Sequence, residues 1–124
     1  MAKVKVYPIQ VDFDVPVRDV AGTTVTSNTD GCEVVLNGKD DNGNVYSVKD
    51  ESAVIKLENT NSSELEVTVK AGDGWAAVND YTFTLPSSST VYMRFEGAKY
   101  KNKGAIILIP KTASALKVTA YNFK

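Results

Sequence analysis

The chain has 124 residues, 43% of them hydrophobic and 23% charged, and its formal net charge at pH 7 is −1. These values are typical of one globular domain, here residues 1–124, and they exclude a disordered chain. The nearly balanced charge does not favour nucleic acid as a partner. The chain has no histidine, so the commonest general base and zinc ligand are missing, and its single cysteine cannot form an internal disulfide. We therefore expect no enzymatic activity, no metal and no cofactor.

The N-terminal region alternates apolar and polar residues but contains two prolines. In "VYPIQVDFDVPV" (6–17), Pro8 and Pro16 interrupt an alternation that is otherwise typical of a strand. Because proline cannot donate a hydrogen bond to a sheet ladder, residues 1–20 are predicted to form an edge strand or an extended arm. The first residues contain no apolar run of signal-peptide length, and no stretch approaches the roughly 18 apolar residues of a membrane span. We expect synthesis without a classical signal and no membrane contact.

Residues 18–50 are less regular. The stretch 18–31 is expected to be a loop around a short strand at Thr24–Thr26. The segment "CEVVL" (32–36) is predicted to pair with "VYSV" (45–48) as a long hairpin through "NGKDDNGN" (37–44). The first residue of "CEVVL" is Cys32, the lone cysteine. It has no CxxC partner and is expected to be a buried small hydrophobe.

The acidic turn "KDDNGN" (39–44) suggests either a calcium loop or a tight turn. An EF-hand loop needs glycine at its sixth position, but the sixth residue counted from Asp40 is Val45. Asn42-Gly43 is better explained as a hairpin turn that needs a positive φ.

The second half of the chain has a strong period of two. In "ELEVTVK" (64–70), Leu65, Val67 and Val69 alternate with polar residues. Six strands are expected here, at 53–57, 64–70, 81–85, 91–95, 105–109 and 116–120, separated by connectors rich in Asn, Ser, Pro or Gly. Only "AAVND" (76–80) and "AKYKN" (98–102) have room for a helical turn. The pattern predicts an all-β fold, an antiparallel Ig-like or jelly-roll-like sandwich of about eight strands.

Trp75, the only tryptophan, follows Gly72-Asp73-Gly74 and is the most conspicuous ligand candidate. An exposed indole could stack on a sugar ring together with Tyr92 and Tyr100, provided that their strand ends converge. A phosphate cradle is less well supported, because Asp73 would repel the anion. The interpretation that we favour is a crossover between sheets, with the indole capping one end of the core.

The most charged local stretch is "RFEGAKYKNKG" (94–104), in which Lys99, Lys101 and Lys103 surround Tyr100. It has three interpretations: a solvated hairpin end, a basic edge that meets an acidic protein surface, or a nucleic-acid contact. The rest of this acidic chain gives no support for the third.

The segments "AVIKLENTNSSELEVTVKAGDGW" and "YTFTLPSSSTVYMRFEGAKYKNKGAIILI" contain a strand ending in Asn-Thr, a "VTVKAG" strand, a "TLP" turn and a Glu followed by "KYKN". Over residues 53–109 the chain thereby resembles small head proteins of tailed bacteriophages and prophages, which are regarded as capsid decoration or auxiliary head proteins. The resemblance implies a non-enzymatic virion protein that binds the outer surface of the capsid and stabilises it. The major capsid protein would be its partner, and assembly would occur in the host cytoplasm. A homo-oligomer is compatible with this role.

Two groups of residues are candidates for capsid contact. They are Val4, Val6, Tyr7 and Ile9 of the N-terminal arm, and Lys99, Tyr100, Lys101 and Lys103 of the basic loop. An arm of this kind could lie along a neighbouring subunit as an added strand. The alternative function is a carbohydrate-binding module or a tail-associated adhesin domain that uses Trp75, Tyr92 and Tyr100.

Overall fold

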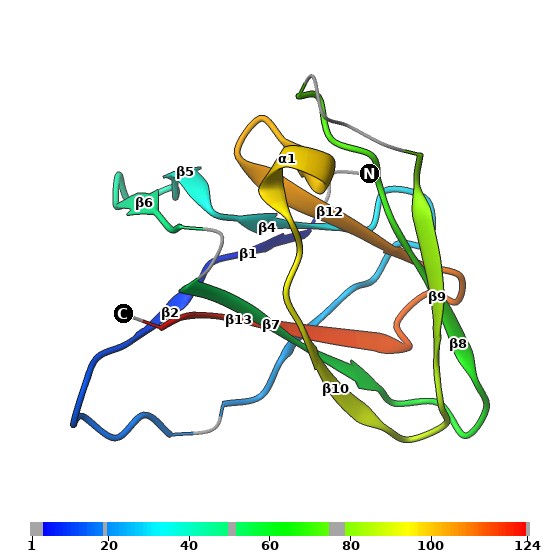
Figure 1. Ribbon diagram of the computed structural model, residues 1–124. Helices are drawn as coiled ribbons and strands as arrows, with labels where there is room; N and C mark the ends of the chain where they lie inside the picture. Colours follow the sequence, from blue (N-terminus) through cyan, green and yellow to red (C-terminus); the bar gives the residue numbers. More distant parts are fainter. Residues whose placement is uncertain (1–3, 19, 50–51, 75–78, 124) are drawn as a thin grey trace.

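The computed structural model describes residues 4–18, 20–49, 52–74 and 79–123 (Figure 1). These residues form an all-β structure in which two larger sheets enclose a shared apolar core. A two-stranded hairpin projects from one side of the sandwich, and a single helical turn lies over the first sheet (Figure 1). The predicted β-sandwich class is confirmed.

The first sheet has six strands among the described residues. Their order is β1 (Val4–Val6), β4 (Cys32–Val35), β12 (Ala105–Pro110), β8 (Leu65–Val69) and β9 (Tyr81–Leu85), with β11 (Lys101–Asn102) pairing with β12. The predicted alternation is present in β8, where Leu65, Val67 and Val69 are buried and Glu66 is exposed.

The second sheet has five strands in the described part of the chain. Their order is β10 (Thr90–Met93), β7 (Ala53–Asn59), β13 (Leu116–Phe123) and β2 (Ile9–Val11), with β3 (Thr23–Thr24) also pairing with β13. The antiparallel pair of β7 and β13 forms the centre of this sheet. The separate hairpin consists of β5 (Asn37–Lys39) and β6 (Val45–Ser47), and the helical turn is α1 (Gly97–Tyr100).

All six strands predicted in the second half are present, as β7, β8, β9, β10, β12 and β13. The helical turn expected within residues 98–102 is α1, one residue earlier, whereas the one expected at 76–80 lies mostly outside the described residues. The described part of the chain contains thirteen strand segments. This exceeds the expected number of about eight because strands of two or three residues are too short to produce a recognisable alternation.

The long hairpin predicted for residues 32–48 is wrong. β4 pairs with β1 and β12, while β6 pairs with β5. A hydrogen bond of 2.9 Å from the Val48 N–H to the Leu36 carbonyl connects the last residue of "VYSV" to the last residue of "CEVVL". The apolar content of both segments was correctly recognised, but β12, about 70 residues away in sequence, is the better hydrogen-bonding partner of β4.

The N-terminal segment is divided between the two sheets. β1 pairs in parallel with β4, and β2 pairs in parallel with β13, so the expectation of a purely antiparallel sandwich is wrong for these two pairs. Pro8 lies between them, where the chain passes from one sheet to the other. Residues 4–11 are therefore edge strands of this domain, as one of the two predictions had it, and not a free arm.

The two sheets share one core. Its fully buried side chains include Val34, Leu57, Val67, Leu108 and Val118, which come from strands of both sheets. Cys32 belongs to the same cluster, and burial raises the pKa of its thiol to about 12. The prediction that this cysteine is a buried small hydrophobe is confirmed.

Candidate functional site

The outer face of the second sheet is divided into a charged half and an apolar half. Along β7, Val54, Lys56 and Glu58 alternate with core residues. Strand β13 places Lys117 opposite Glu58, Thr119 opposite Lys56 and Tyr121 opposite Val54. Charged and hydroxyl side chains therefore lie toward one end of the two strands, and apolar and aromatic side chains lie toward the other.

The charged half is covered by the chain itself. Gly22 lies so close to the sheet that a Cβ placed on it would be 3.0 Å from Lys117 Cβ and 3.1 Å from Thr119 Oγ1. Beneath this segment Lys56 is only 5% exposed, and its Nζ lies 3.4 Å from Glu58 Oε1. Lys56 and Thr119 in this half of the face are therefore buried within the domain.

The apolar half is open and forms a hollow of about 470 Å³. We call it the aromatic hollow; it is lined by Val11, Val17, Arg18, Val54, Tyr92, Tyr121 and Phe123. The rings of Tyr121 and Phe123 lie 6.0 Å apart, and the Tyr92 side chain is 60% exposed. Four strands or segments that are distant in sequence are needed to build this surface.

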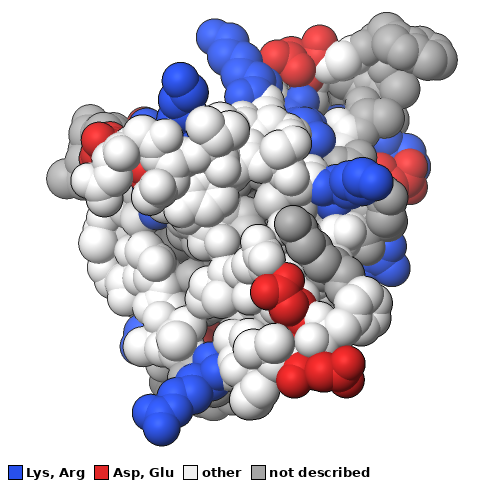
Figure 2. All heavy atoms as spheres, turned by 90° about the vertical axis from the view of Figure 1, so that its left-hand side faces the viewer, with Lys and Arg blue, Asp and Glu red and all other residues white. Residues whose placement is uncertain are grey.

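Residues 12–18, which we call the N-terminal strip, share Val17 and Arg18 with the hollow and expose further apolar side chains between Asp12 and Asp14 and beyond. Phe13 is 82% exposed and Val15 is 55% exposed. Figure 2 shows the side of the molecule formed by this strip, the β5–β6 hairpin and the C-terminal end of β13; a large uncharged area lies to the left of its centre, and acidic side chains lie just below and to the right of the centre. Large apolar side chains that gather on one surface are typical of a site for association with another molecule.

The N-terminal residues predicted to contact a capsid are used within the domain. Val6 is buried in the core, so the prediction that its side chain contacts a partner is wrong. Val4 packs against the same core, and Tyr7 stacks on Tyr46 with ring centroids 5.0 Å apart. Ile9 is half-buried, opposite Tyr121 in the second sheet. The alternation of this segment reflects pairing within the domain.

The basic loop also makes internal contacts. Lys99 Nζ lies 3.2 Å from Glu96 Oε1, and Lys101 Nζ donates a hydrogen bond of 2.8 Å to Asn37 Oδ1. The Tyr100 ring packs edge-on against a core aromatic ring, that of Phe95, with centroids 6.1 Å apart. Two of the lysines thus help to hold the loop in place.

The glycine-rich segment before Trp75 is attached to this loop. The Gly72 N–H donates to the Lys99 carbonyl at 2.8 Å, and the Asp73 N–H donates to the Lys101 carbonyl at 3.2 Å. A Cβ on Gly72 would lie 2.8 Å from the Lys101 carbonyl oxygen. Glycine is therefore required here for close approach of two backbones, and these N–H groups are occupied rather than available for an anion. Asp73 Oδ2 in turn accepts the N–H of Lys103 at 3.1 Å.

The described part of the structure does not bring together the residues of the sugar-binding hypothesis. Trp75 lies outside them. Tyr92 lies in the aromatic hollow on the second sheet, whereas Tyr100 packs beside the core near β9, with its ring 6.5 Å from that of Tyr81. The convergence that the sugar hypothesis requires is absent for this pair of tyrosines.

The acidic turn in the β5–β6 hairpin has the predicted hairpin geometry. Gly43 has φ +84°, and Asp40 Oδ1 accepts the backbone N–H groups of Asn42 and Asn44 at 3.0 and 2.9 Å. Asp40 Oδ2 accepts the side-chain amide of Asn44 at 3.0 Å. Both carboxylate oxygens therefore stabilise the turn, and within the described residues no group of three or more acidic or cysteine side chains is placed to hold a metal.

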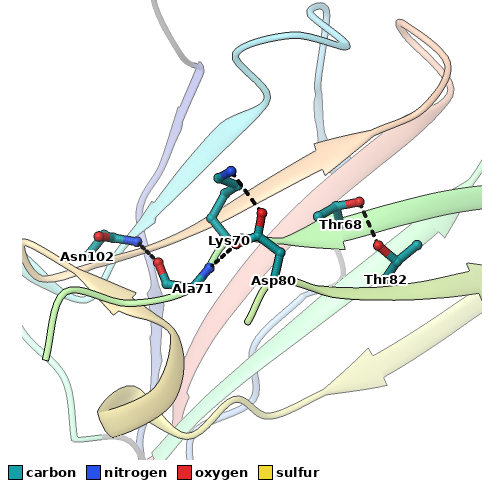
Figure 3. Close-up of polar contacts among 6 residues, drawn as sticks. All are labelled: Thr68, Lys70, Ala71, Asp80, Thr82 and Asn102. Atoms are coloured by element: carbon teal, nitrogen blue, oxygen red, sulfur yellow. Dashed lines mark hydrogen bonds and ion pairs between the residues drawn. The ribbon is translucent and has the colours of Figure 1, made fainter. Parts of the chain in front are cut away.

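Asp80 connects the end of β8 to the start of β9 (Figure 3). Its two oxygens accept the Ala71 N–H at 2.7 Å and Lys70 Nζ at 2.9 Å. The backbone hydrogen bond from Ala71, together with the side-chain hydrogen bond from Lys70 Nζ, holds the pKa of the Asp80 carboxyl below its ordinary value. Asn102 donates to the Ala71 carbonyl on the other side, so one network joins β8, β9 and β11.

We expect Asp80→Asn to lower the free energy of unfolding at pH 7 by about 1 kcal/mol or less, because the site is partly exposed to solvent. A carboxyl whose pKa is depressed by folding contributes stability above its unfolded-state pKa and loses it as pH falls through the folded-state value. The difference between variant and wild type should therefore shrink as the pH falls below the ordinary pKa of an aspartate and vanish once the folded-state carboxyl is protonated. Urea unfolding at pH 7 and at low pH, followed by circular dichroism, measures this, with Asp41→Asn as the charge-matched control. An equal loss at both pH values would contradict the role given to the Asp80 charge.

Comparison of the chain with family models, with curated proteins and with solved structures found no match. In the described part of the chain, no helix has the length and apolarity needed to cross a membrane. Any function proposed for this chain therefore rests on its sequence, its fold and its surface.

Proposed function

We propose that this protein is a non-enzymatic structural protein that binds the outer surface of a phage capsid through the aromatic hollow. The observation that carries the proposal is the concentration of exposed Tyr92 and Phe123, with the neighbouring N-terminal strip, on one side of the sandwich. The resemblance of residues 53–109 to head proteins of tailed phages supplies the class of partner. The proposed contact surface therefore differs from the sequence-based one at Val4, Val6 and Tyr7, and lies on the outer face of the second sheet, where Ile9 is the pairing partner of Tyr121.

Arg18 adds one positive charge to the otherwise uncharged lining of the hollow. It lies among the apolar lining residues, where its guanidinium can donate two hydrogen bonds to a carboxylate of the partner. Apolar burial would provide most of the affinity, and the charge would orient the complex. On a capsid the same contact is repeated many times, so modest individual affinities are sufficient for stable attachment to a reinforced shell.

The test is co-sedimentation of the purified protein with empty heads of the phage that encodes it. Tyr92→Ser combined with Phe123→Ser should weaken binding at least about tenfold, because aromatic residues at the centre of an interface dominate its energy. The matched control is Ile107→Ser, which removes a half-buried apolar side chain from the outer face of the other sheet. Absence of wild-type binding to these heads, or equal binding by the double variant, would refute the proposal.

Carbohydrate binding is the second candidate function. The rings that would contact the sugar are Tyr92, Tyr121 and Phe123 of the aromatic hollow, in place of the set Trp75, Tyr92 and Tyr100 suggested by the sequence. Exposed aromatic rings around one hollow provide faces on which a sugar can stack. Titration with glycans of the host surface, followed by tyrosine fluorescence and calorimetry, distinguishes the two functions. Saturable glycan binding that Tyr92→Ser abolishes, without binding to heads, would replace the capsid proposal with this one.

A further inference from the structure

Strand β9 has a backbone edge without a partner in the described residues. It is the last strand of the first sheet and pairs only with β8, from Leu65↔Leu85 to Val69↔Tyr81. An unpaired edge presents alternate N–H and C=O groups that fit one kind of occupant, another extended strand. The edge is far from the aromatic hollow, which lies on the other sheet.

The sequence of β9, "YTFTL", has none of the devices that usually protect an edge. It contains no charged residue, no proline and no glycine. The edge strand β1, by contrast, has Lys5 at its centre, and β10 is followed directly by Arg94. Asp80 and Pro86 lie immediately outside β9 and limit the unprotected edge to these five residues.

Two of the three side chains on the core side of β9 are incompletely buried. Tyr81 is 45% exposed and Phe83 is only partly buried, although both face the same side as the buried Leu85. On the opposite side, the Thr82 and Thr68 hydroxyls are hydrogen-bonded at 3.0 Å (Figure 3). An added strand would bury the aromatic row and extend the threonine row.

We propose that β9 pairs antiparallel with β9 of a second copy of this chain, about a twofold axis at Phe83. In this register Phe83 faces its own copy, Tyr81 faces Leu85, and Thr82 faces Thr84. Every cross-strand pair then joins apolar to apolar or hydroxyl to hydroxyl, and no like charges meet. The strand is therefore self-complementary, which favours a second copy over an unrelated strand.

A twofold contact of this kind also prevents the unprotected edge from pairing with further chains and aggregating. Each β9 uses the other's free groups, so the association closes at a dimer and does not propagate into fibres. The two first sheets become one continuous sheet, and both aromatic hollows remain accessible. The inference does not depend on the proposed function.

Sedimentation velocity over a concentration series tests the dimer. Wild type should dimerise, and Thr82→Lys combined with Thr84→Lys should raise the dissociation constant at least about tenfold, because two lysine pairs would face each other across the axis. The matched control, Thr90→Lys with Thr112→Lys, adds the same charge at exposed sites outside β9 and should leave the dissociation constant unchanged. A monomeric wild type at all concentrations would overturn the proposal, as would equal weakening by the control.

Charge-swapped variants test the register itself. Thr82→Lys with Thr84→Glu places lysine opposite glutamate in the proposed register and should retain the dimer. A pairing centred one residue away, at Thr82, would place lysine opposite lysine, so loss of this variant's dimer overturns the register. Circular dichroism verifies that each variant is folded.

Cross-linking provides a readout that does not depend on the stability of charged variants. Mixing Thr82→Cys with Thr84→Cys chains under mild oxidation should give a disulfide-linked dimer, since directly opposed residues have Cβ atoms close enough to bridge. The native Cys32 is buried and should not take part. A yield no greater than that of either variant alone would contradict the pairing.

Discussion

Replacing Gly31 with alanine is expected to lower the free energy of unfolding by about 3 kcal/mol or more. Gly31 has φ +68°, a left-handed conformation that costs other residues about 1 kcal/mol. A Cβ at this position would also lie 2.2 Å from the Leu108 carbonyl oxygen and 2.7 Å from Ile109 Cγ1. Because the first of these atoms is backbone within β12, the clash cannot be relieved by a side-chain rotation.

The effect should extend to the start of the first sheet. Gly31 immediately precedes β4, and its carbonyl accepts the N–H of Val4 at 3.3 Å. Displacement of this residue therefore disturbs β1, β4 and β12 together. Urea unfolding followed by circular dichroism measures the loss.

Gly43→Ala is the matched control for this prediction. Gly43 has φ +84°, but a Cβ there would meet no atom within 4 Å. Only the cost of the left-handed conformation applies, so the expected loss is about 1 kcal/mol. Equal losses for the two variants would show that the contact with β12 is unimportant.

Replacing Asn59 with alanine should lower the free energy of unfolding by about 2–4 kcal/mol. The side chain is 3% exposed, and its Nδ2 donates to the carbonyls of Ser63 and Pro86 at 3.0 Å and of Leu85 at 3.3 Å. Its Oδ1 accepts the N–H of Asn61 at 3.0 Å. One amide thus joins the β7–β8 turn to the end of β9, and its removal takes away the hydrogen bonds to one buried and three part-buried backbone groups.

Thermal and urea unfolding of Asn59→Ala should be compared with those of Asn61→Ala. Asn61 lies in the same turn, but its contacts to neighbouring residues here are made by the backbone N–H and carbonyl. The control should therefore change stability by about 0.5 kcal/mol or less. A loss of this small size for Asn59→Ala would contradict the role of the buried amide.

The strands of the second half could be predicted from local pattern because apolar and polar residues alternate in most of them and turn residues separate them. In β8 this gives the clear alternation of Leu65, Val67 and Val69 with polar residues. Turn chemistry was equally local, and Asn42-Gly43 adopts the predicted geometry because only glycine tolerates the required φ without cost.

The aromatic hollow could not be predicted in the same way. It combines Val11 of β2, Val54 of β7, Tyr92 of β10, and Tyr121 and Phe123 of β13. The strand predicted at 116–120 stopped short of Tyr121 and Phe123, and which face these two rings occupy depends on registers between strands that are far apart in sequence. The same dependence explains why the N-terminal alternation suggested a free arm when it reflects two parallel pairings.

By itself, the sequence determined the β class, the positions of most strands, the burial of Cys32 and the turn at Gly43. The tertiary structure alone decided which strands are neighbours, that Gly72 is needed for contact with the backbone of residues 99–101, and that the exposed apolar side chains gather on one side. The physical reason is that alternation and backbone preference act within a few residues, whereas pairing, register and surface composition arise from contacts between distant segments.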